Sequence, residues 1–573
     1  MIEPQEPKSS AEVDRLPDSD RNQLWSALVA NANKPEQQQD SSWDLIVIGG
    51  GITGAGILRE AARRGLKVLL LEQQDFAWGT SSRSSKMVHG GLRYLGQGDY
   101  KLTQHSLRER ERLLSEVPGL VDRMGYFFTL RKDKSPPPWA VKILLWLYDR
   151  LAGIRDHRRI DLSALEQEFP GIDRQQLKDC FYYTDAVTDD ARLVLRVLHE
   201  AVADGGKAIN YIKVDNLLTD AAGVITGVAV TNQQPSESET LQSSLKLQSK
   251  LVINATGAWA DKLRNQVNPE KRIRPLRGSH LVVPQSRLSV SQAVTLMHPG
   301  DYRAMFVFPW EGRTVIGTTD IDHGEGLDSE ASISVEEVRY LLDAANDLFP
   351  AAKLNSGDVI SSWSGVRPVI GSEKSKDPSK ERRDHAVWRD GNLITVSGGK
   401  LTTFRLIALD VLKTAADIIP IDTADDSLAI FSPVTVTASQ LPLCETAQAH
   451  SLIARYGDGV KSFVGDVCAD ELKPIADTQY SLAECRWLLR RENVVHLDDL
   501  LLRRTRLGQL LDAGAEQLFD SLSAIFQQEL KWTDGRWQAE VERYRELWKR
   551  HYYLPTELTN KDNAADRVDE MSV

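Results

Sequence analysis

Short runs of consecutive apolar residues recur along the chain at wide intervals. Residues 43–48 form one such run, and Gly49, Gly51 and Gly54 follow it in the spacing G-x-G-x-x-G. A continuous apolar run of this length predicts a strand that is buried on both faces, as in a parallel sheet. The residues after the glycines predict a helix that ends near Arg64. The segment therefore has the order strand, glycine turn, helix.

A second apolar run, Val68–Leu71, ends at Glu72. In such a unit Gly49 permits a tight turn, Gly51 lets the backbone approach a pyrophosphate, and Gly54 lets the helix pack closely on the strand. The helix N-terminus offers N–H groups to phosphates. Glu72 ends the second strand, where a carboxylate can accept hydrogen bonds from ribose hydroxyls. The segment predicts a dinucleotide site, and the alternative is a glycine-rich turn that only packs.

Further apolar runs predict strands of the same sheet far along the chain, at 209–214, 224–230, 251–254 and 392–396. Two of them lead into turns of small residues, which are Ala255, Thr256, Gly257 and Trp259 after the third run and Gly399, Lys400, Leu401 and Thr402 after the fourth. Small residues let the backbone approach a bound cofactor. A helix to about Ala416 follows the last turn. The sheet is therefore expected to be assembled from distant segments.

The remaining pattern divides into two kinds. Residues 275–335 alternate in the manner of antiparallel strands, and residues after Val436 have helical periodicity. The predicted fold class is α/β plus α, with a Rossmann-like cofactor domain, a β-rich substrate or cap domain and a C-terminal helical domain. The expected boundaries are 43–130, 189–274 and 358–420 for the cofactor domain, 131–188 and 275–357 for the cap, and 436–555 for the helical domain.

Several classes of protein are excluded by the chain ends, the net charge and the cysteines. Residues 1–42 are polar and lack the apolar core of a secretory signal, so they predict a disordered leader, and residues 556–573 predict a tail. A net charge of −11 excludes a general nucleic-acid binder. The scattered cysteines indicate a reducing compartment and no structural metal. They are Cys180, Cys444, Cys468 and Cys485. No apolar run is long enough to predict a membrane-spanning helix.

Seven motifs, in a fixed order, give the chain a resemblance to the FAD-dependent glycerol-3-phosphate dehydrogenases, within the wider group of D-amino-acid-oxidase-like flavoproteins. They are TSSRSSKMVHGGLRYL at 80–95, DDARLV at 189–194, NATG at 254–257, GSH at 278–280, GTTD at 317–320, SGVRP at 364–368 and GGKLTT at 398–403. The run DDLLLRRT at 498–505 also resembles the family. The resemblance covers residues 43–550 and leaves out the leader and the acidic tail.

The resemblance implies FAD, and non-covalent binding is expected because no His or Cys stands at an obvious attachment position. The loop 80–91 carries five hydroxyl residues and is expected to wrap the diphosphate and the flavin ring, although alone it would also fit a solvated serine-rich loop. The expected cofactor contacts are Gly49, Gly51, Gly54, Glu72, Thr80, Ser81, Ser82, Ser84, Ser85, His89, Gly90, Gly91, Val214, Ala255, Thr256, Gly257, Trp259, Gly399, Lys400, Leu401 and Thr402.

A substrate that carries a phosphate needs preorganised cations, either the planar fork of Arg or the compact charge of Lys. The resemblance implies that Arg93, Tyr94, Arg367 and Lys400 bind glycerol 3-phosphate. The implied reaction moves a hydride from C2 of the substrate to flavin N5 and gives dihydroxyacetone phosphate. His280 is the expected base, since imidazole titrates near neutral pH, and Arg367 shares this role. The alternative for His280 is a structural hydrogen bond.

Residues 131–160 bear on the acceptor of the electrons from the reduced flavin. Eight Lys and Arg residues against three Asp flank a Trp-rich apolar stretch at 139–148. A short apolar helix with basic flanks fits a helix lying in the interface of an anionic membrane, and the alternative is an ordinary core helix. The expected protein is cytoplasmic, bound to the inner face of the membrane, and passes electrons to a membrane quinone. A homodimer is left open.

Three other functions are left open. A glycerol-3-phosphate oxidase that produces hydrogen peroxide would carry much the same motifs. A related flavoenzyme would act on an amino acid or another 2-hydroxy compound, although the cluster Arg93, Arg367 and Lys400 disfavours a substrate with a single carboxylate. A non-catalytic flavin-binding module is disfavoured by the intact cationic and histidine positions.

Overall fold

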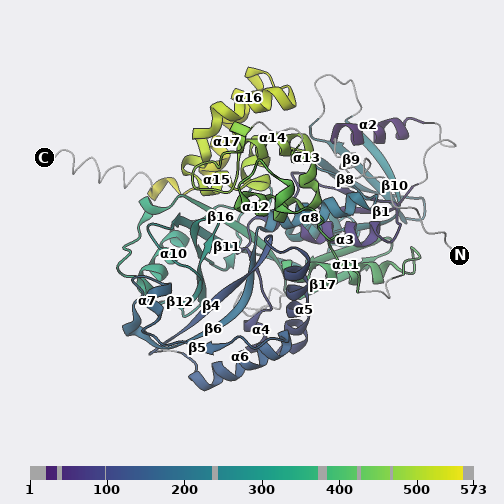
Figure 1. The fold of residues 1–573 in the computed structure, drawn as a ribbon. Helices are drawn as coiled ribbons and strands as arrows, with labels where there is room; N and C mark the ends of the chain where they lie inside the picture. Colours follow the sequence, from purple (N-terminus) through teal and green to yellow (C-terminus); the bar gives the residue numbers. More distant parts are fainter. Residues whose placement is uncertain are drawn as a thin grey trace.

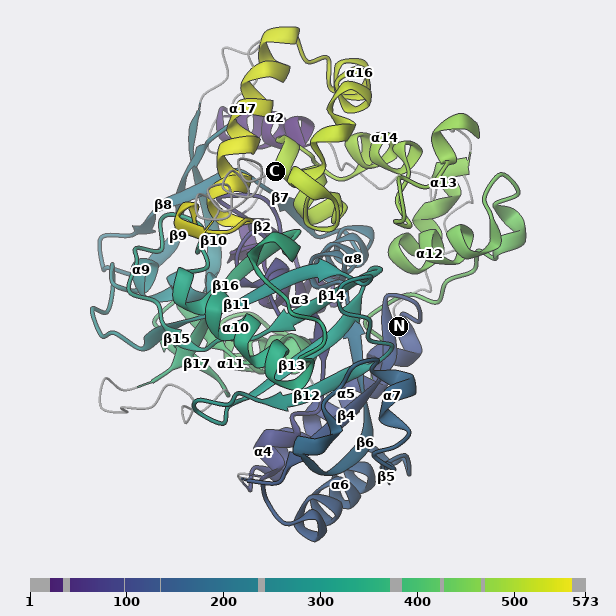
Figure 2. The same ribbon diagram turned by 90° about the vertical axis from the view of Figure 1, so that its left-hand side faces the viewer.

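Two sheets lie next to each other, and a helical unit from the C-terminal part of the chain packs against them (Figure 1). The computed structural model describes residues 21–34, 42–96, 98–133, 135–234, 243–371, 384–422, 427–464 and 469–558. The helical unit lies at one end of the molecule, and α6 (Pro138–Ala152) lies at the opposite end (Figure 2). Residues 235–242 of a polar stretch lie outside the described residues, as do Cys468 and most of the tail.

The first sheet holds the predicted dinucleotide strands in the order β17-β18-β10-β1-β2-β7. The strands from β18 to β7 pair in parallel, β17 is antiparallel to β18, and β8 and β9 extend antiparallel from β10. Because the parallel strands end at one edge, the turns after β1, β10 and β18 converge there. The bounds are β1 (Trp43–Ile48), β2 (Val68–Leu71), β7 (Lys207–Ile209), β8 (Ile212–Thr219), β9 (Ile225–Asn232), β10 (Ser244–Asn254), β17 (His385–Asp390) and β18 (Leu393–Gly398).

Helices cover both faces of this sheet. On one face α3 (Ile52–Ala62), α8 (Asp190–Ala203) and α11 (Phe404–Ala415) share an apolar cluster with β1, β2 and β10. On the other face lies α2 (Arg21–Ala32), which buries Trp25, Leu28 and Val29 against Ile46 and Ile212. Helices therefore pack on both faces of the first sheet.

The helix α2 corrects the prediction of a disordered leader over residues 1–42. The stretch is polar overall, but Trp25, Leu28 and Val29 share one face of a helix and meet an apolar sheet face that composition alone does not reveal. Arg21 at the helix start is buried and donates to the carbonyl oxygen of Asn210 at 3.0 Å. Residues 1–20 and 35–41 lie outside the described part of the chain.

The second sheet contains the predicted antiparallel region and runs in the order β15-β11-β14-β13-β12-β4-β6-β3, with β16 beside β11 and β5 beside β6. Helix α10 (Val335–Leu348) packs on this sheet. A capping box formed by Ser334 and Glu337 closes the N-terminus of the helix. The bounds are β3 (Met87–Val88), β4 (Val121–Arg131), β5 (Arg158–Arg159), β6 (Leu177–Thr188), β11 (Ile273–Pro284), β12 (Ala293–Met297), β13 (Ala304–Trp310), β14 (Arg313–Gly317), β15 (Ile321–Asp322) and β16 (Ser361–Ile370).

This sheet moves two of the expected domain boundaries. Strand β4 lies within 43–130 apart from its last residue, and β16 lies within 358–420, yet both belong to the second sheet rather than to the cofactor domain. Sheet membership follows from the pairing partner, and β4 pairs with β6 while β16 pairs with β11. A local apolar pattern does not specify that partner.

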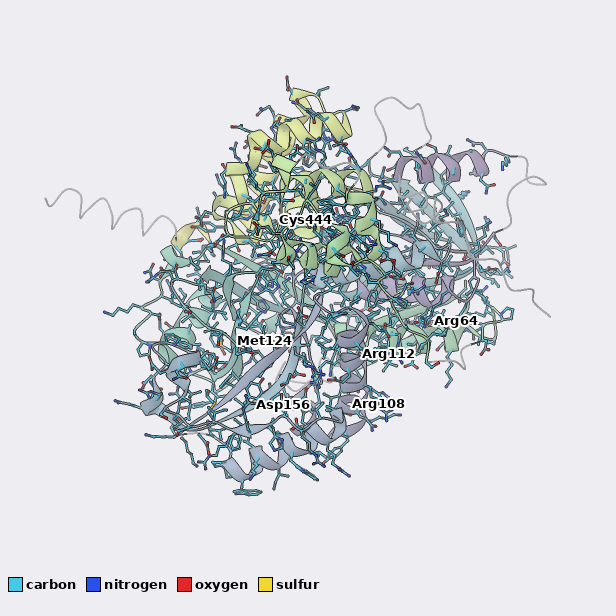
Figure 3. All side chains as sticks on the ribbon, viewed as in Figure 1. Arg64, Arg108, Arg112, Met124, Asp156 and Cys444 are labelled. Carbon is cyan, nitrogen blue, oxygen red and sulfur yellow. The ribbon has the colours of Figure 1, made fainter. Side chains whose placement is uncertain are left out.

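Small helices surround the second sheet. They are α4 (Leu92–Gly96), α5 (Tyr100–Glu116), α6 and α7 (Leu165–Glu168), with α9 (Ala260–Arg264) following β10. Arg108 is exposed on the outer side of α5, whereas Met124 of β4 is buried (Figure 3). None of the helices that the structure describes combines the length and the apolar character needed to cross a bilayer.

The C-terminal unit is helical, as expected, and a break separates α16 from α17. Lys531 adopts φ 59° and ends α16, and the side chain of Thr533 caps the next helix. The run DDLLLRRT contains a π-helix at Asp499–Arg504. The other helices are α12 (Thr446–Tyr456), α13 (Lys461–Val464), α14 (Leu482–Arg491), α15 (Leu507–Leu510), α16 (Phe519–Leu530) and α17 (Asp534–His551).

Candidate active site

A cavity of about 1280 Å³ is lined by residues of both sheets. Single ligand pockets usually have volumes of about 300–1,000 Å³, so this cavity has room for a large cofactor together with a small substrate. The turns after β1, β10 and β18 form one part of its wall, and strands β4, β6, β13 and β16 contribute to the other.

The turn after β1 has the geometry of a phosphate cradle. Gly49 has φ 112°, and a Cβ atom there would lie 2.6 Å from the carbonyl oxygen of Ala255. A Cβ on Gly54 would collide with the carbonyl oxygen of Gly49, so helix α3 packs directly on the turn. The N–H of Ile52 in the first turn of α3 donates to the hydroxyl of Ser81 at 3.0 Å. A phosphate oxygen suits the same donor.

Glu72 lies beside this turn, at the end of β2. Its Oε2 accepts from the N–H of Gly50 at 2.6 Å and its Oε1 accepts from that of Gln74 at 2.8 Å. Burial raises the pKa of Glu72 above its ordinary value, against the lowering effect of these hydrogen bonds. Glu72 lines the cavity, in agreement with its predicted position beside a ribose.

The loop 80–91 runs along the cavity and joins the two sheets. Thr80 donates to the carbonyl oxygen of Val366 in β16, and the N–H of His89 donates to the hydroxyl of Thr402 at 3.2 Å. Most of the expected cofactor contacts line the cavity. The exceptions are Gly54, which packs the helix, and Ser82 and Gly90, which lie behind the wall.

All three expected cations line the cavity. Lys400 lies 3.9 Å above the ring of Tyr94, and its Nζ donates to the hydroxyl of Ser106 at 3.1 Å. Arg93 lies in the short helix α4, which begins directly after Gly91. Gly91 has φ 85°, and a Cβ there would lie 2.9 Å from the Nζ of Lys400. The glycine is therefore needed for the lysine and the tyrosine to approach the loop.

Arg367 projects from β16 on another side of the cavity. It donates to Asp320 at 3.2 Å and to the hydroxyl of Thr318 at 3.1 Å, and Asp320 also pairs with Arg303 at 3.4 Å. Asp320 and Arg303 were missed by the sequence reasoning. The motif GTTD at 317–320 contained Asp320, whereas no local pattern distinguished Arg303.

His280 differs from its expected place. Its side chain is 0% exposed, and it is not among the residues that line the cavity. The ring stacks on Trp363 with centroids 5.0 Å apart, and its Nε2 lies 2.9 Å from the hydroxyl of Ser85, which does line the cavity. Burial lowers the pKa of His280 well below 6.5, and Arg367 and Lys86 lower it further. His280 thus reaches the cavity through Ser85, while His89 lines it directly.

The part of the cavity beside α4 and α6 is largely apolar. Phe128, Leu144, Met297 and Phe306 line it. The hydroxyl of Tyr126 also belongs to this wall and is buried without a hydrogen-bond partner. Sequence reasoning missed these residues because they are core-type side chains of strands and helices. The four apolar side chains give the cavity an apolar stretch of wall, which we call the chamber, and polar residues such as Asp185 and Thr295 also line the cavity.

The residues present fit FAD. The cradle at Gly49 excludes side chains where a diphosphate would approach, and the carboxyl of Glu72 stands where the sequence placed a ribose. The loop 80–91 supplies hydroxyls along the cavity wall. The volume and the donors therefore suit the whole dinucleotide.

Comparisons with known proteins agree with this geometry. Residues 44–408 match the family described as FAD dependent oxidoreductase, and residues 429–537 match the C-terminal domain of alpha-glycerophosphate oxidase. The aerobic glycerol-3-phosphate dehydrogenase of Staphylococcus aureus (strain USA300) is 36% identical over 380 residues, which are 65% of this chain and 67% of the relative.

Solved structures agree as well. The glycerol-3-phosphate dehydrogenase of Bacillus halodurans, complexed with FAD, has 27% identity and a TM-score of 0.74 over 93% of this chain and 98% of its own. The L-alpha-glycerophosphate oxidase of Mycoplasma pneumoniae, with FAD bound, shares the fold at 16% identity and a TM-score of 0.53, over 70% of this chain and 100% of its own. The predicted family, fold class and cofactor are confirmed, and the chain is an FAD-dependent oxidoreductase that belongs to the glycerol-3-phosphate dehydrogenase family.

Proposed function

We propose that the protein oxidises sn-glycerol 3-phosphate to dihydroxyacetone phosphate and passes the electrons to a membrane quinone. The observation that supports this substrate is that Arg93, Arg367 and Lys400 all line one cavity. Three cations suit a phosphate dianion better than a single carboxylate, and charge pairs strengthen where water is excluded. Membership of the family supports the same substrate. Bound FAD supplies the hydride acceptor, N5 of its ring.

The side chains around the cavity divide the work of binding. Lys400 and Arg93 lie beside the turns at Gly91 and Gly399 and hold the phosphate. Arg367 is fixed by Thr318 and Asp320, so its guanidinium orients the hydroxyls of the glycerol part. Positioning of this kind lowers the barrier to hydride transfer because the entropy of alignment is lost on binding.

The proton of the C2 hydroxyl leaves through Ser85. In this scheme the hydroxyl of Ser85 receives it and gives its own proton to Nε2 of His280, which lies 2.9 Å away. The lowered pKa keeps the imidazole neutral, and therefore able to accept, at and below neutral pH. Arg367 lowers the pKa of the substrate hydroxyl and so assists the transfer.

The quinone is supported by the chamber next to α6. Leu144 of α6 lines the cavity, while Trp139, Ile143 and Trp146 of the same helix are exposed by 67%, 56% and 55%. One helix therefore borders both the chamber and the exterior. An apolar quinone ring suits the apolar side chains of Phe128, Met297 and Phe306 on this part of the wall.

The outer face of α6 also supports an interfacial position on an anionic membrane. Large exposed aromatic residues mark interaction surfaces, and basic residues such as Lys142 and Arg150 lie on the same helix. Lys134, counted in the basic segment, lies outside the described residues. We infer that this face rests on the inner leaflet of the cytoplasmic membrane, with the C-terminal unit at the far end (Figure 2).

The reaction is tested by mixing the oxidised holoenzyme anaerobically with glycerol 3-phosphate. The flavin absorbance is expected to bleach, with one dihydroxyacetone phosphate formed per flavin, and a soluble quinone is expected to restore the colour faster than oxygen. Glycerol and D-amino acids are the control substrates. Bleaching by a D-amino acid at the rate of glycerol 3-phosphate would contradict the substrate, and preferential reoxidation by oxygen with peroxide release would indicate an oxidase.

The base is tested with His280→Asn and Ser85→Ala. Each is expected to lower kcat/KM about a hundredfold, the usual loss for a general base. In the wild type the acid limb of the kcat/KM profile should lie below pH 6.5, since the pKa of His280 is lowered and the imidazole stays neutral to lower pH. His89→Gln is the comparison. Near-normal turnover of His280→Asn together with a large loss in His89→Gln would assign the base to His89.

Membrane binding is tested by flotation with vesicles that contain anionic lipid. The wild type is expected to float at low salt, and the double change Trp139→Ser and Trp146→Ser is expected to remain at the bottom, because the apolar anchor is lost. The matched control is Leu428→Ser with Leu443→Ser, two exposed apolar residues of the C-terminal part. Equal flotation of both double variants would refute the role of α6.

A further inference from the structure

All residues of the run 498–506 are buried, and none of them lines the cavity. Its three arginines, Arg503, Arg504 and Arg506, are at most 1% exposed. Buried charges need partners, because desolvation is costly. Some of their partners, Asp498, Asp499 and Glu492, lie in the C-terminal unit itself. The others, Asp75, Asp189 and Asp190, lie outside this unit and behind the segments that line the cavity, so the run connects the C-terminal unit to these segments.

The first connection reaches the turn after Glu72. Asp75 is fully buried and accepts from Nε of Arg503 at 2.6 Å and from Nη1 and Nη2 of Arg504 at 2.6 and 2.8 Å. The two residues before Asp75, Gln73 and Gln74, line the cavity. The arginines therefore hold this turn from behind.

The second connection reaches the loop 80–91. Arg506 donates to Asp189 and Asp190, each at 2.6 Å, and Asp190 in turn accepts from the N–H and the hydroxyl of Ser84 at 2.9 and 2.7 Å. The buried ammonium of Lys86 joins the same carboxylate at 2.8 Å and donates to the carbonyl oxygen of Ser82 at 2.6 Å. Arg506 thus anchors the loop through one shared carboxylate.

The third connection comes from the end of α17. The hydroxyl of Tyr552 accepts from Nε and Nη2 of Arg83 at 3.1 and 2.8 Å, and Arg83 also pairs with Glu330 at 2.5 Å. Arg83 lines the cavity, whereas Tyr552 does not. The residue that follows α17 therefore fixes a side chain in the middle of the loop.

We propose that the C-terminal helical unit is a clamp for the cofactor, which holds the turn 73–75 and the loop 82–86 in the geometry that binds FAD. The residues Arg503, Arg504, Arg506 and Tyr552 are positioning residues, because they act through Asp75, Asp190 and Arg83. Loops that are ordered before binding do not lose that conformational freedom on binding, so the affinity for FAD rises. The proposal rests on the cofactor alone and is independent of the substrate and the electron acceptor.

Tyr552→Phe is the mildest test, since it removes one hydroxyl and leaves Arg83 paired with Glu330. The rate of FAD release is measured on the holoenzyme by the rise of free-flavin fluorescence after dilution. We expect release to be about tenfold faster, as for the loss of a hydrogen bond to a charged group. The matched control is Tyr544→Phe, whose hydroxyl donates to the carbonyl oxygen of Gly514 within the C-terminal unit. The control should release FAD at the rate of the wild type.

Arg506→Gln is the stronger test, and its matched control is Arg455→Gln. Arg455 is also buried, and it pairs with Glu484 at 2.8 and 2.9 Å, inside the C-terminal unit. Both changes should lower the thermal stability, but only Arg506→Gln should speed FAD release, with little rescue by Arg506→Lys because lysine lacks the planar fork. Equal release rates in Arg506→Gln and Arg455→Gln would overturn the clamp. If Arg506→Gln does not fold, unchanged release from Tyr552→Phe overturns it.

Discussion

The turn after β1 packs against the turn after β10 so closely that only glycine fits between them, and the arrangement of the site depends on this contact. A side chain on Gly49 would meet the backbone of Ala255, so the ends of the two strands form one continuous edge. This edge offers the N–H groups at the start of α3 to a diphosphate. The loop 80–91 connects this edge to the second sheet, since Thr80 hydrogen-bonds to Val366 in β16.

Charge organises the remainder of the molecule in two layers. In the layer that faces the cavity, cations such as Lys400 and Arg367 line the space that is open to a ligand. In the layer behind it, arginines of the C-terminal unit neutralise Asp75 and Asp190, so that the polar loops are held without exposing them to water. Buried ion pairs contribute little net stability compared with apolar residues of similar size. Their value here is a single defined loop geometry, which apolar packing alone would not specify.

The sequence predicted the parts of the site that depend on local pattern, and it failed where tertiary packing decides. The glycine spacing after β1 and the acid Glu72 belong to one local sequence pattern, so the sequence alone predicted them. His280 was expected to meet the substrate, but its stacking on Trp363 places it behind Ser85. The helix at Arg21–Ala32 was missed because its apolar face is covered by a sheet formed by distant residues.

The central claim is that Lys400 and Arg93 bind the phosphate of the substrate in this cavity, next to the flavin, while Arg367 holds the glycerol part. The most direct measurement is the dissociation constant of glycerol 3-phosphate for Lys400→Gln, taken anaerobically from the shift of the flavin spectrum before reduction. The dissociation constant of Lys400→Gln is expected to be at least about tenfold higher than that of the wild type, as for the loss of one charged hydrogen bond. The control is Lys250→Gln on the surface, which should leave the dissociation constant unchanged. An unchanged constant in Lys400→Gln would contradict the account.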